Sequence, residues 1–284
     1  MNYRECYEQG KSLLAAAQIE EAALDARLLL EYVCETNRND LLVHGEREVE
    51  KAKEEQYRLL IAKRLQHIPL QHLTGVQDFM GLTFTVSDKV LVPRQDTEIL
   101  VEEVLRNLHD RMRILDMCTG SGCILISLLH YSNDCVGVGA DISKEALLVA
   151  RQNALRILGE ETMLDQRIRL LHSDLFSQIE GKFDMIVSNP PYIRTAVIDT
   201  LMPEVKEHEP ILALDGKEDG LYYYQRIVDE SRDYLNKGGM LFFEIGFDQA
   251  EDVCRMMKTA GFFEVQVVQD YAGLDRVVYG TFLG

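Results

Sequence analysis

The four residues Asn189-Pro190-Pro191-Tyr192 are the part of the sequence best suited to chemistry on a planar nitrogen. They directly follow the apolar run at 185–188, so the loop begins where a buried strand should end. Neither proline nitrogen carries a hydrogen, so the loop offers acceptors rather than donors. The Asn189 side-chain oxygen and the carbonyls beside the prolines can accept both hydrogens of an NH2 group, while Tyr192 supplies an aromatic face. The loop predicts recognition of an amide or a nucleobase amine.

A second candidate site is the glycine-containing turn Cys118-Thr119-Gly120-Ser121-Gly122. It follows a strand expected at 113–116, which ends in Asp116, and it precedes a helix expected to run to about His130. Glycines let the backbone approach a ligand at the amino end of a helix. The turn lacks the third glycine of the GxGxxG pattern, which disfavours NAD as the ligand.

Two more expected strands end in candidate ligand residues. Asp141 follows the strand expected at 136–140, where a carboxylate can bind both hydroxyls of a ribose. The strand at 168–171 leads into Ser173-Asp174-Leu175-Phe176, whose acid and apolar side chains are suited to border an adenine ring. Each acid also has an ordinary alternative role, since Asp116 can cap a turn and Asp141 can start a helix. The four strand ends together favour a ligand site, because open α/β sheets bind ligands at this edge.

The elements that must position these residues fall into three segments. Residues 1–75 are charged and helical in pattern, which predicts a small bundle whose last helix ends before Pro69. Residues 76–92 have the pattern of a β-hairpin linker. From 93 to 284 short apolar strands alternate with amphipathic helices, which predicts an α/β domain with a parallel sheet.

Composition excludes several classes of protein. The 47 acidic and 30 basic residues give a net charge of −17, which argues against direct binding of duplex DNA. Six scattered cysteines form no CxxC pair, and the histidines show no HExxH spacing, so we expect neither disulfides nor a metal site. No apolar stretch has the length of a signal peptide or membrane span, so we expect a cytoplasmic protein without a membrane partner.

Three further segments carry secondary candidates. Glu244 lies between Phe243 and Ile245 on an expected buried strand, where its charge needs a partner such as Arg94. Near that arginine, Asp96 or Thr97 is expected to cap a helix, with Glu98 favouring its positive end. We interpret the tyrosines at 222–224 as packing residues, and the loop at 194–220 as a lid or docking surface.

The combination of the acid before the glycine turn, the acid after the next strand and the Asn-Pro-Pro-Tyr loop resembles class I S-adenosylmethionine-dependent methyltransferases acting on planar nitrogen. More specific segments resemble the HemK/PrmC family of protein-(glutamine-N5) methyltransferases that modify peptide chain release factors. These segments are Arg64, Pro69-Leu70-Gln71-His72-Leu73-Thr74-Gly75, Phe79, Pro93-Arg94-Gln95-Asp96-Thr97-Glu98, Glu209-Pro210, Gly216-Lys217-Glu218-Asp219-Gly220-Leu221, Phe243-Glu244-Ile245-Gly246 and Asp275-Arg276. The resemblance covers nearly the whole chain.

The resemblance implies a Rossmann-like seven-stranded sheet preceded by an N-terminal helical bundle, and we expect the bundle to recognise the substrate because it is separate from the cofactor site. It implies that the turn at 118–122, Asp141 and Asn189 hold S-adenosyl-L-methionine, with Asp174 and Leu175 near the adenine and S-adenosyl-L-homocysteine as product. The segment 93–98, with Arg94, Thr97 and Glu98, would lie against the methionine portion. The loop at 189–192 would receive the glutamine of the Gly-Gly-Gln motif, with Asn189, Pro190 and Tyr192 in catalytic roles.

Two other classes of function stay open from the residues alone. A nucleic-acid methyltransferase acting on adenine N6 or cytosine N4 faces the same delocalised NH2 group, although reaching a paired base requires flipping and a basic groove. A non-catalytic adaptor would use the helical segment for binding, with the sheet as a relic. Transfer of label from the cofactor to protein, to nucleic acid or to neither distinguishes the three.

Overall fold

The computed structural model describes residues 1–159 and 166–284, and these form two compact units. The first unit comprises residues 1–76 together with 202–208, and the second comprises residues 77–201 and 209–284. In the described part of the chain, every helix is too short or too polar to span a membrane.

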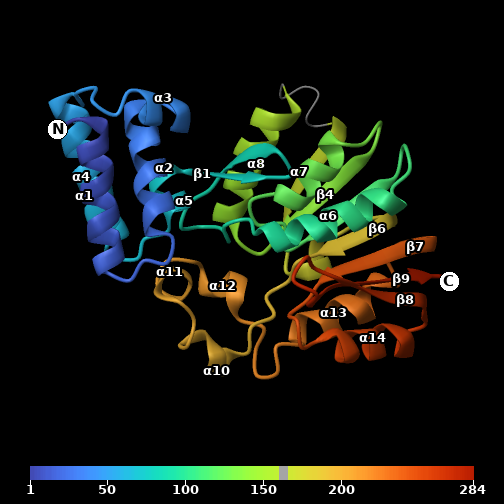
Figure 1. Ribbon diagram of the computed structural model, residues 1–284. Coiled ribbons are helices and arrows are strands. Elements are labelled where there is room, and N and C mark those ends of the chain that lie inside the picture. Colours follow the sequence, from blue (N-terminus) through green and yellow to red (C-terminus); the bar gives the residue numbers. More distant parts are fainter. Residues whose placement is uncertain (160–165) are drawn as a thin grey trace. The chain divides into compact units, whose positions relative to one another are not determined.

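The first unit is a helical bundle around one apolar core, with α1 to α4 drawn in blue in Figure 1. Its helices are α1 (Tyr3–Ala16), α2 (Ala22–Cys34), α3 (Arg38–Val43), α4 (Lys51–Arg64), α5 (Leu70–Thr74) and, from the distant segment, α11 (Pro203–Lys206). Asn2 and Asn37 cap α1 and α3 with side-chain hydrogen bonds, which explains where those helices begin. The expected end of helical structure before Pro69 is wrong, because Pro69 is itself the N-cap residue of α5.

A buried ion pair joins three segments of the bundle. Arg64 donates from Nε to Asp25 at 2.7 Å and from Nη1 to Glu204 at 3.0 Å. Burial raises the pKa of Asp25, although Arg64 opposes that effect. His67 also contacts Glu204, and the hydrogen bonds from His67 and Arg64 hold the pKa of Glu204 below its ordinary value despite its burial. These contacts explain why residues near 204 belong to the helical unit.

The second unit contains a seven-stranded sheet with the order β5-β4-β3-β6-β7-β9-β8. The strands are β3 (Arg113–Met117), β4 (Val136–Asp141), β5 (Ile168–His172), β6 (Phe183–Ser188), β7 (Leu235–Glu244), β8 (Phe262–Gln269) and β9 (Asp275–Phe282). Strands β3 to β7 pair in parallel, while β9 is antiparallel to both neighbours. The bounds of β3, β4, β5 and β6 agree with the strands expected from sequence to within two residues at each end.

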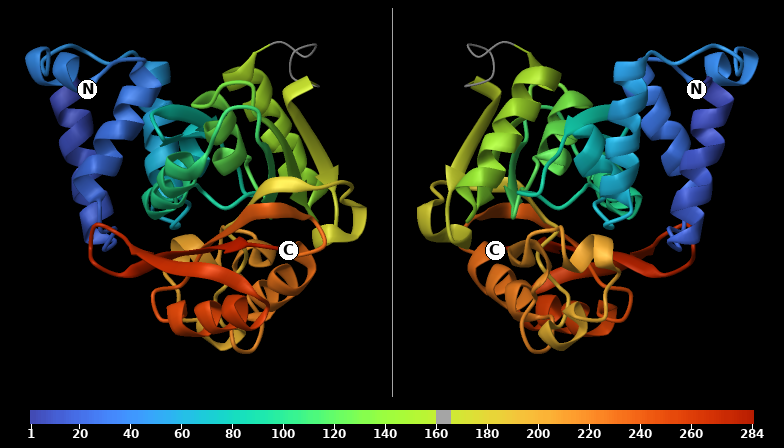
Figure 2. Two further views of the ribbon diagram at one scale, coloured as in Figure 1. Left: turned by 90° about the vertical axis from the view of Figure 1, so that its right-hand side faces the viewer. Right: turned by 90° about the vertical axis from the view of Figure 1, so that its left-hand side faces the viewer.

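Helices cover both faces of this sheet, so the unit has three layers (Figures 1 and 2). One face carries α6 (Gln95–Asn107), α7 (Cys123–His130) and α8 (Lys144–Leu158), and the other carries α13 (Tyr222–Ser231) and α14 (Ala250–Thr259). A separate apolar core lies between the sheet and each helix layer. One core includes Leu100 and Leu125, and the other includes Ile227 and Val253. The central strands β3 and β6 are therefore buried on both faces, as is usual for parallel strands, while the edge strands β5 and β8 keep exposed residues.

The expected hairpin is present as β1 (Val76–Phe79) and β2 (Leu82–Thr85), and it is attached to the sheet unit. The buried Asn153 side chain on α8 accepts from the Thr85 backbone nitrogen at 2.7 Å and donates to its carbonyl at 3.0 Å. The Asn153 side-chain amide thus makes the same two hydrogen bonds to Thr85 that the backbone of a neighbouring strand would make. From residue 77 onward, the hairpin is part of the second unit.

Candidate active site

A cavity of about 260 Å³ lies at the carboxyl edge of the parallel strands. Its walls come from the turn after β3, the end of β4, the short 3-10 helix η1 (Leu175–Gln178), the loop after β6 and the start of α6. Among the residues proposed from sequence, the cavity is lined by Arg94, Thr97, Cys118, Thr119, Gly120, Ser121, Asp141, Asp174, Leu175, Asn189 and Pro191. Segments spread over about a hundred residues thus meet at one place, as expected for an open α/β sheet.

The turn after β3 exposes backbone to the cavity. Cys118, Gly120 and Gly122 have positive φ angles of 64°, 55° and 79°. A Cβ placed on Gly120 would meet nothing within 4 Å, so the side of this backbone that faces the cavity is open. A Cβ on Gly122 would lie 2.7 Å from Ile126 Cδ1, so Gly122 permits close packing of the turn on α7 rather than lining the cavity.

Asp116 lies beneath this turn, fully buried and outside the cavity wall. Its Oδ2 accepts a hydrogen bond from the Thr119 hydroxyl at 2.6 Å. Its Oδ1 has no hydrogen-bond partner among the described residues. Burial raises the pKa of Asp116 to about 7, against the opposing effect of Thr119. Asp116 therefore supports the turn from below.

Asp141 joins the turn to the end of β4. Its Oδ2 accepts from the Gly120 backbone nitrogen at 2.9 Å, and its Oδ1 accepts from the Ser143 nitrogen at 2.8 Å. Burial raises the pKa of Asp141 even though these backbone bonds lower it. Each carboxylate oxygen keeps a second lone pair, so the group can still accept from two hydroxyls on the cavity side.

The part of the cavity that is lined by η1 and α13 is partly aromatic. Leu175 is buried there, whereas Asp174 is exposed and forms an ion pair with Arg226 at 3.0 Å. The interpretation of residues 222–224 as packing is correct for Tyr224, which is fully buried. Tyr223 also packs against the apolar core around Tyr224, and both Tyr222 and Tyr223 line the cavity, a role for which a run of tyrosines gives no sequence signal.

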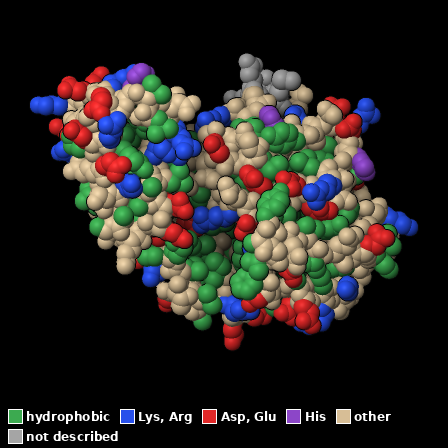
Figure 3. Space-filling model, viewed as in Figure 1, with side chains coloured by type: hydrophobic (Ala, Val, Ile, Leu, Met, Phe, Trp, Pro, Cys, Tyr) green, Lys and Arg blue, Asp and Glu red, His purple; other side chains and the backbone are tan. Residues whose placement is uncertain are grey.

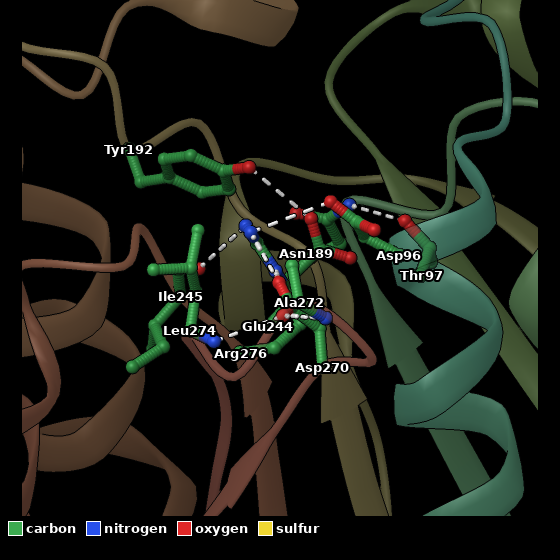
Figure 4. A network of polar contacts seen from close by, with 10 residues as sticks. All are labelled: Asp96, Thr97, Asn189, Tyr192, Glu244, Ile245, Asp270, Ala272, Leu274 and Arg276. Carbon is green, nitrogen blue, oxygen red and sulfur yellow. Dashed lines mark hydrogen bonds and ion pairs between the residues drawn. The ribbon is translucent and has the colours of Figure 1, made fainter.

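The loop after β6 contributes Asn189 and Pro191 to the cavity wall, and Figure 4 shows the polar contacts of Asn189 and Tyr192. Asn189 donates from Nδ2 to Thr97 Oγ1 at 3.4 Å, while the hydroxyl of Tyr192 donates to Glu244 Oε1 at 3.2 Å. Pro190 is buried behind the loop, and Pro191 lines the cavity. Burial raises the pKa of Tyr192 well above its ordinary range, and the negative charge of Glu244 adds to the effect. Tyr192 is therefore a neutral donor.

The expected pairing of Glu244 with Arg94 is wrong. Arg94 instead donates from Nη2 to Glu209 Oε2 at 2.6 Å, and Glu209 Oε1 accepts from the Val92 nitrogen at 3.2 Å. Burial raises the pKa of Glu209 despite the nearby guanidinium. Glu209 thereby holds the segment before α6 in place, and Glu244 accepts a hydrogen bond from the Tyr192 hydroxyl instead.

The start of α6 also differs from the sequence expectation. The N-cap residue is Arg94, with no side-chain capping bond, rather than Asp96 or Thr97. Asp96 instead forms an ion pair with Arg276 at 3.3 Å. Glu98 accepts from the Met80 nitrogen at 2.6 Å, so it anchors the hairpin and does not line the cavity. Both acids still lie in the first helical turn, where the helix dipole favours them.

Gln249 is a residue of the site that sequence reasoning missed. Its side-chain Nε2 donates to the carbonyls of Tyr192 and Gly220, at 3.1 and 3.2 Å, and its Oε1 accepts from the Gly246 nitrogen at 2.9 Å. The residue is only 3% exposed. It fixes the chain directly after the double proline, and a single glutamine after a strand carries no local signal of that role.

Comparison with known proteins agrees with this architecture. Residues 5–75 match the PrmC N-terminal domain family, and residues 94–206 match the methyltransferase small domain family. A methyltransferase structure from Pyrococcus furiosus shares the fold, with a TM-score of 0.53 and 19% identity over 81% of this chain and 98% of that one.

Two curated relatives are similar along their full lengths. The release factor glutamine methyltransferase of Clostridium acetobutylicum is 38% identical over 283 residues, covering 98% of both chains. The protein of the same name from Moorella thermoacetica is 41% identical over 280 residues, covering 97% of both. The expected class I methyltransferase fold is thus confirmed, and the chain belongs to the release factor glutamine methyltransferase family.

Proposed function

We propose that this protein transfers a methyl group from S-adenosyl-L-methionine to the side-chain amide nitrogen of the glutamine in the Gly-Gly-Gln motif of peptide chain release factors. The observation that carries the proposal is the position of Asn189, at a strand end, on the wall of a cavity that also contains the glycine turn and Asp141. Full-length relatives bearing the name release factor glutamine methyltransferase support the choice of substrate.

The residues of the cavity fit the proposed cofactor. Open backbone at Gly120 gives room for a ligand to lie against the turn, and the free lone pairs of Asp141 suit two ribose hydroxyls. Tyr222, Tyr223 and Leu175 form apolar walls at the end where an adenine would lie. When bound, the cofactor supplies an electrophilic methyl group on a sulfonium and leaves as S-adenosyl-L-homocysteine.

The protein's task is to orient a poor nucleophile. The lone pair of an amide nitrogen is delocalised into its carbonyl, as the rotation barrier of about 18–20 kcal/mol in peptides reflects. Asn189 Oδ1 and the carbonyl of Pro190 can accept the two hydrogens of the substrate amide, so the nitrogen's electron density points toward the methyl group. A new N–C bond forms as the S–C bond breaks, and the electron pair of that bond stays on sulfur. The nitrogen then loses one proton to an acceptor.

The two units divide the work in this proposal. Residues 1–75, joined by 202–208, form the substrate-recognition domain, residues 76–92 form the linking hairpin, and the rest of 93–284 forms the methyltransferase domain. The match of residues 5–75 to the PrmC N-terminal domain family supports a dedicated role for the bundle. On α3, the apolar side chains of Leu42 and Val43 are 70% and 74% exposed, which suits contact with a protein.

A transfer assay tests the function. Purified protein with labelled cofactor should label a release factor at its Gly-Gly-Gln glutamine. Asn189→Ala should lose turnover while keeping its affinity for S-adenosyl-L-homocysteine. Changing Leu42 and Val43 together to serine should raise the KM for the release factor but leave that for the cofactor unchanged. Release factor left unlabelled by the wild-type protein would refute the proposal.

Nucleic acid is the control substrate in the same assay. The net charge is −17, and on the face shown in Figure 3 acidic side chains are interspersed among the basic ones. Such a surface does not favour a phosphate backbone. Label in DNA or RNA but not in release factor would replace the proposed substrate with a base amine.

A further inference from the structure

Asn153 is a buried polar residue that the proposed reaction does not use. It lies on α8 among Ala146, Ala150 and Ala154, on the buried side of that helix, and it is 0% exposed. Burying an amide side chain costs free energy unless its polar groups are hydrogen-bonded. An asparagine among alanines therefore indicates a requirement for its hydrogen bonds rather than for its volume.

The Asn153 amide makes three hydrogen bonds to the backbone of two different segments. Its Oδ1 accepts from the Thr85 nitrogen at 2.7 Å, and its Nδ2 donates to the Thr85 carbonyl at 3.0 Å. Nδ2 also donates to the Ser121 carbonyl at 2.9 Å. Both hydrogens of the NH2 group are thus used, one on each carbonyl. A single side chain joins the end of the hairpin to the turn after β3.

Both of these segments lead to the cavity, although Asn153 itself does not line it. Ser121 belongs to the cavity wall directly, together with Gly120. Strand β2 ends at Thr85, and the chain that follows it supplies residues 89–91 to the same cavity. Asn153 therefore lies behind the cavity and is bonded to segments that form two of its walls.

The turn is held against α8 at three successive residues. Gly120 donates to Asp141, just before the helix, at 2.9 Å. Gly122 packs closely on the helix, where an added Cβ would lie 3.2 Å from a side-chain carbon and 3.5 Å from a backbone carbon. Between these two, the carbonyl of Ser121 is bonded to Asn153. Because glycine has wide conformational freedom, the turn depends on such outside contacts to keep one conformation.

We infer that Asn153 is a positioning residue for the cofactor, which holds the Ser121 carbonyl, and with it the turn, in the conformation that receives S-adenosyl-L-methionine. The inference rests on the proposed function for the identity of the ligand. A binding loop that is already ordered binds more tightly, because its ordering need not occur during binding. Loss of the Asn153 hydrogen bonds should therefore weaken cofactor binding and leave the methyl-transfer step itself unchanged.

Two substitutions of Asn153 test the effect of its hydrogen bonds. Asn153→Leu has the same branched shape and crowds the site, whereas Asn153→Ala leaves space, so what they share is the loss of the hydrogen bonds. In calorimetry, both should raise the Kd for S-adenosyl-L-homocysteine about tenfold, as for the loss of one buried hydrogen bond. An unchanged Kd in either folded variant would overturn the inference.

Kinetics distinguish positioning of the cofactor from a general structural role. The KM for S-adenosyl-L-methionine should rise about tenfold in both variants, measured well below their Tm. The kcat and the KM for the release factor should stay within about twofold, because the residues around the reacting atoms are unchanged. A lower kcat with an unchanged cofactor KM would indicate partial unfolding and would overturn the inference.

Two control variants lower stability without removing the bond to the turn. Val86→Ala removes packing between the end of the hairpin and α8. Asn236→Ala removes a hydrogen bond to Asp184 at the start of β7, at the opposite edge of the sheet. Both should lower Tm and leave the Kd for S-adenosyl-L-homocysteine within about twofold. A tenfold rise in Kd for either control would assign the effect to stability or to the hairpin instead, and would overturn the inference.

The wild-type protein supplies a test that does not depend on the variants folding. The side-chain NH2 signals of Asn153 should shift in NMR spectra when S-adenosyl-L-homocysteine is added, because its partner Ser121 is on the cavity wall. Those of Asn236 should not shift. Unshifted Asn153 signals at saturating ligand would overturn the inference. Failure of the wild type to label a release factor would instead refute the proposed function, with ligand binding still measurable.

Discussion

Replacing Asp116 with asparagine should change how stability depends on pH. Asp116 is fully buried, and only one of its oxygens has a hydrogen-bond partner among the described residues. Burial raises its pKa from 3.8 to about 7. The folded state thus holds this proton more tightly than the unfolded state does. The group's contribution to stability is complete below pH 3.8 and is lost as the pH rises to about 7.

The size of the effect follows from the pKa difference. A difference of about three units corresponds to about 4 kcal/mol of unfolding free energy lost by pH 8, at about 1.4 kcal/mol per unit. At pH 5 about 1.5 kcal/mol has already been lost, because the unfolded group is ionised there. Asp116→Asn cannot ionise, so its stability relative to the wild type should rise by about 3 kcal/mol between pH 5 and pH 8.

Urea denaturation of both proteins at a series of pH values measures this difference. The chain contains no tryptophan, so circular dichroism and tyrosine fluorescence are the signals to follow. Other buried acids, such as Glu209 and Glu244, contribute equally to both proteins and cancel in the difference. A difference that stays constant from pH 5 to pH 8 would refute the assignment of a raised pKa to Asp116.

Three other substitutions have expected outcomes. Gln249→Ala leaves buried backbone groups unpaired, so urea denaturation should show a loss of about 2–4 kcal/mol. Arg64→Met leaves two carboxylates of the helical bundle without their cation and should cost about 3 kcal/mol, whereas an unchanged Tm would contradict the buried ion pair. Gly122→Ala should cost about 1 kcal/mol more than Gly238→Ala, since both have φ near +80° but only at Gly122 does a Cβ meet other atoms. Calorimetry should show weaker S-adenosyl-L-homocysteine binding for Gly122→Ala but not for Gly238→Ala. An equal loss of binding affinity in the two variants would refute that reasoning.

Local sequence patterns were sufficient for the strands that carry the site. Strands β3, β4 and β6 are mostly buried, so each is an apolar run that stands out from the amphipathic helices around it, while β5 at the sheet edge is only partly buried. The order of strand, turn and helix then places the residues after each strand on one edge of the sheet. For this reason the sequence alone predicts that Gly120, Asp141 and Asn189 lie close together.

Partners distant in the sequence could not be predicted in the same way. Glu209 lies 115 residues from Arg94, and Glu204 lies 140 residues from Arg64. Many acids in the chain could have paired with either arginine, and local pattern does not rank them. The incorrect pairing of Arg94 with Glu244 came from that ambiguity, as did the placement of residues near 204 outside the helical unit.

The sequence by itself determined strands β3 to β6, and that an acceptor-rich loop follows β6, because strand periodicity and the missing proline hydrogens are properties of neighbouring residues. Only the tertiary structure decided which side chain Asn189 contacts, which acid accepts from Tyr192, and which glutamine holds the loop. Those outcomes depend on burial and on hydrogen-bond geometry between segments up to 92 residues apart. Such contacts exist only once the sheet has brought its strand ends together.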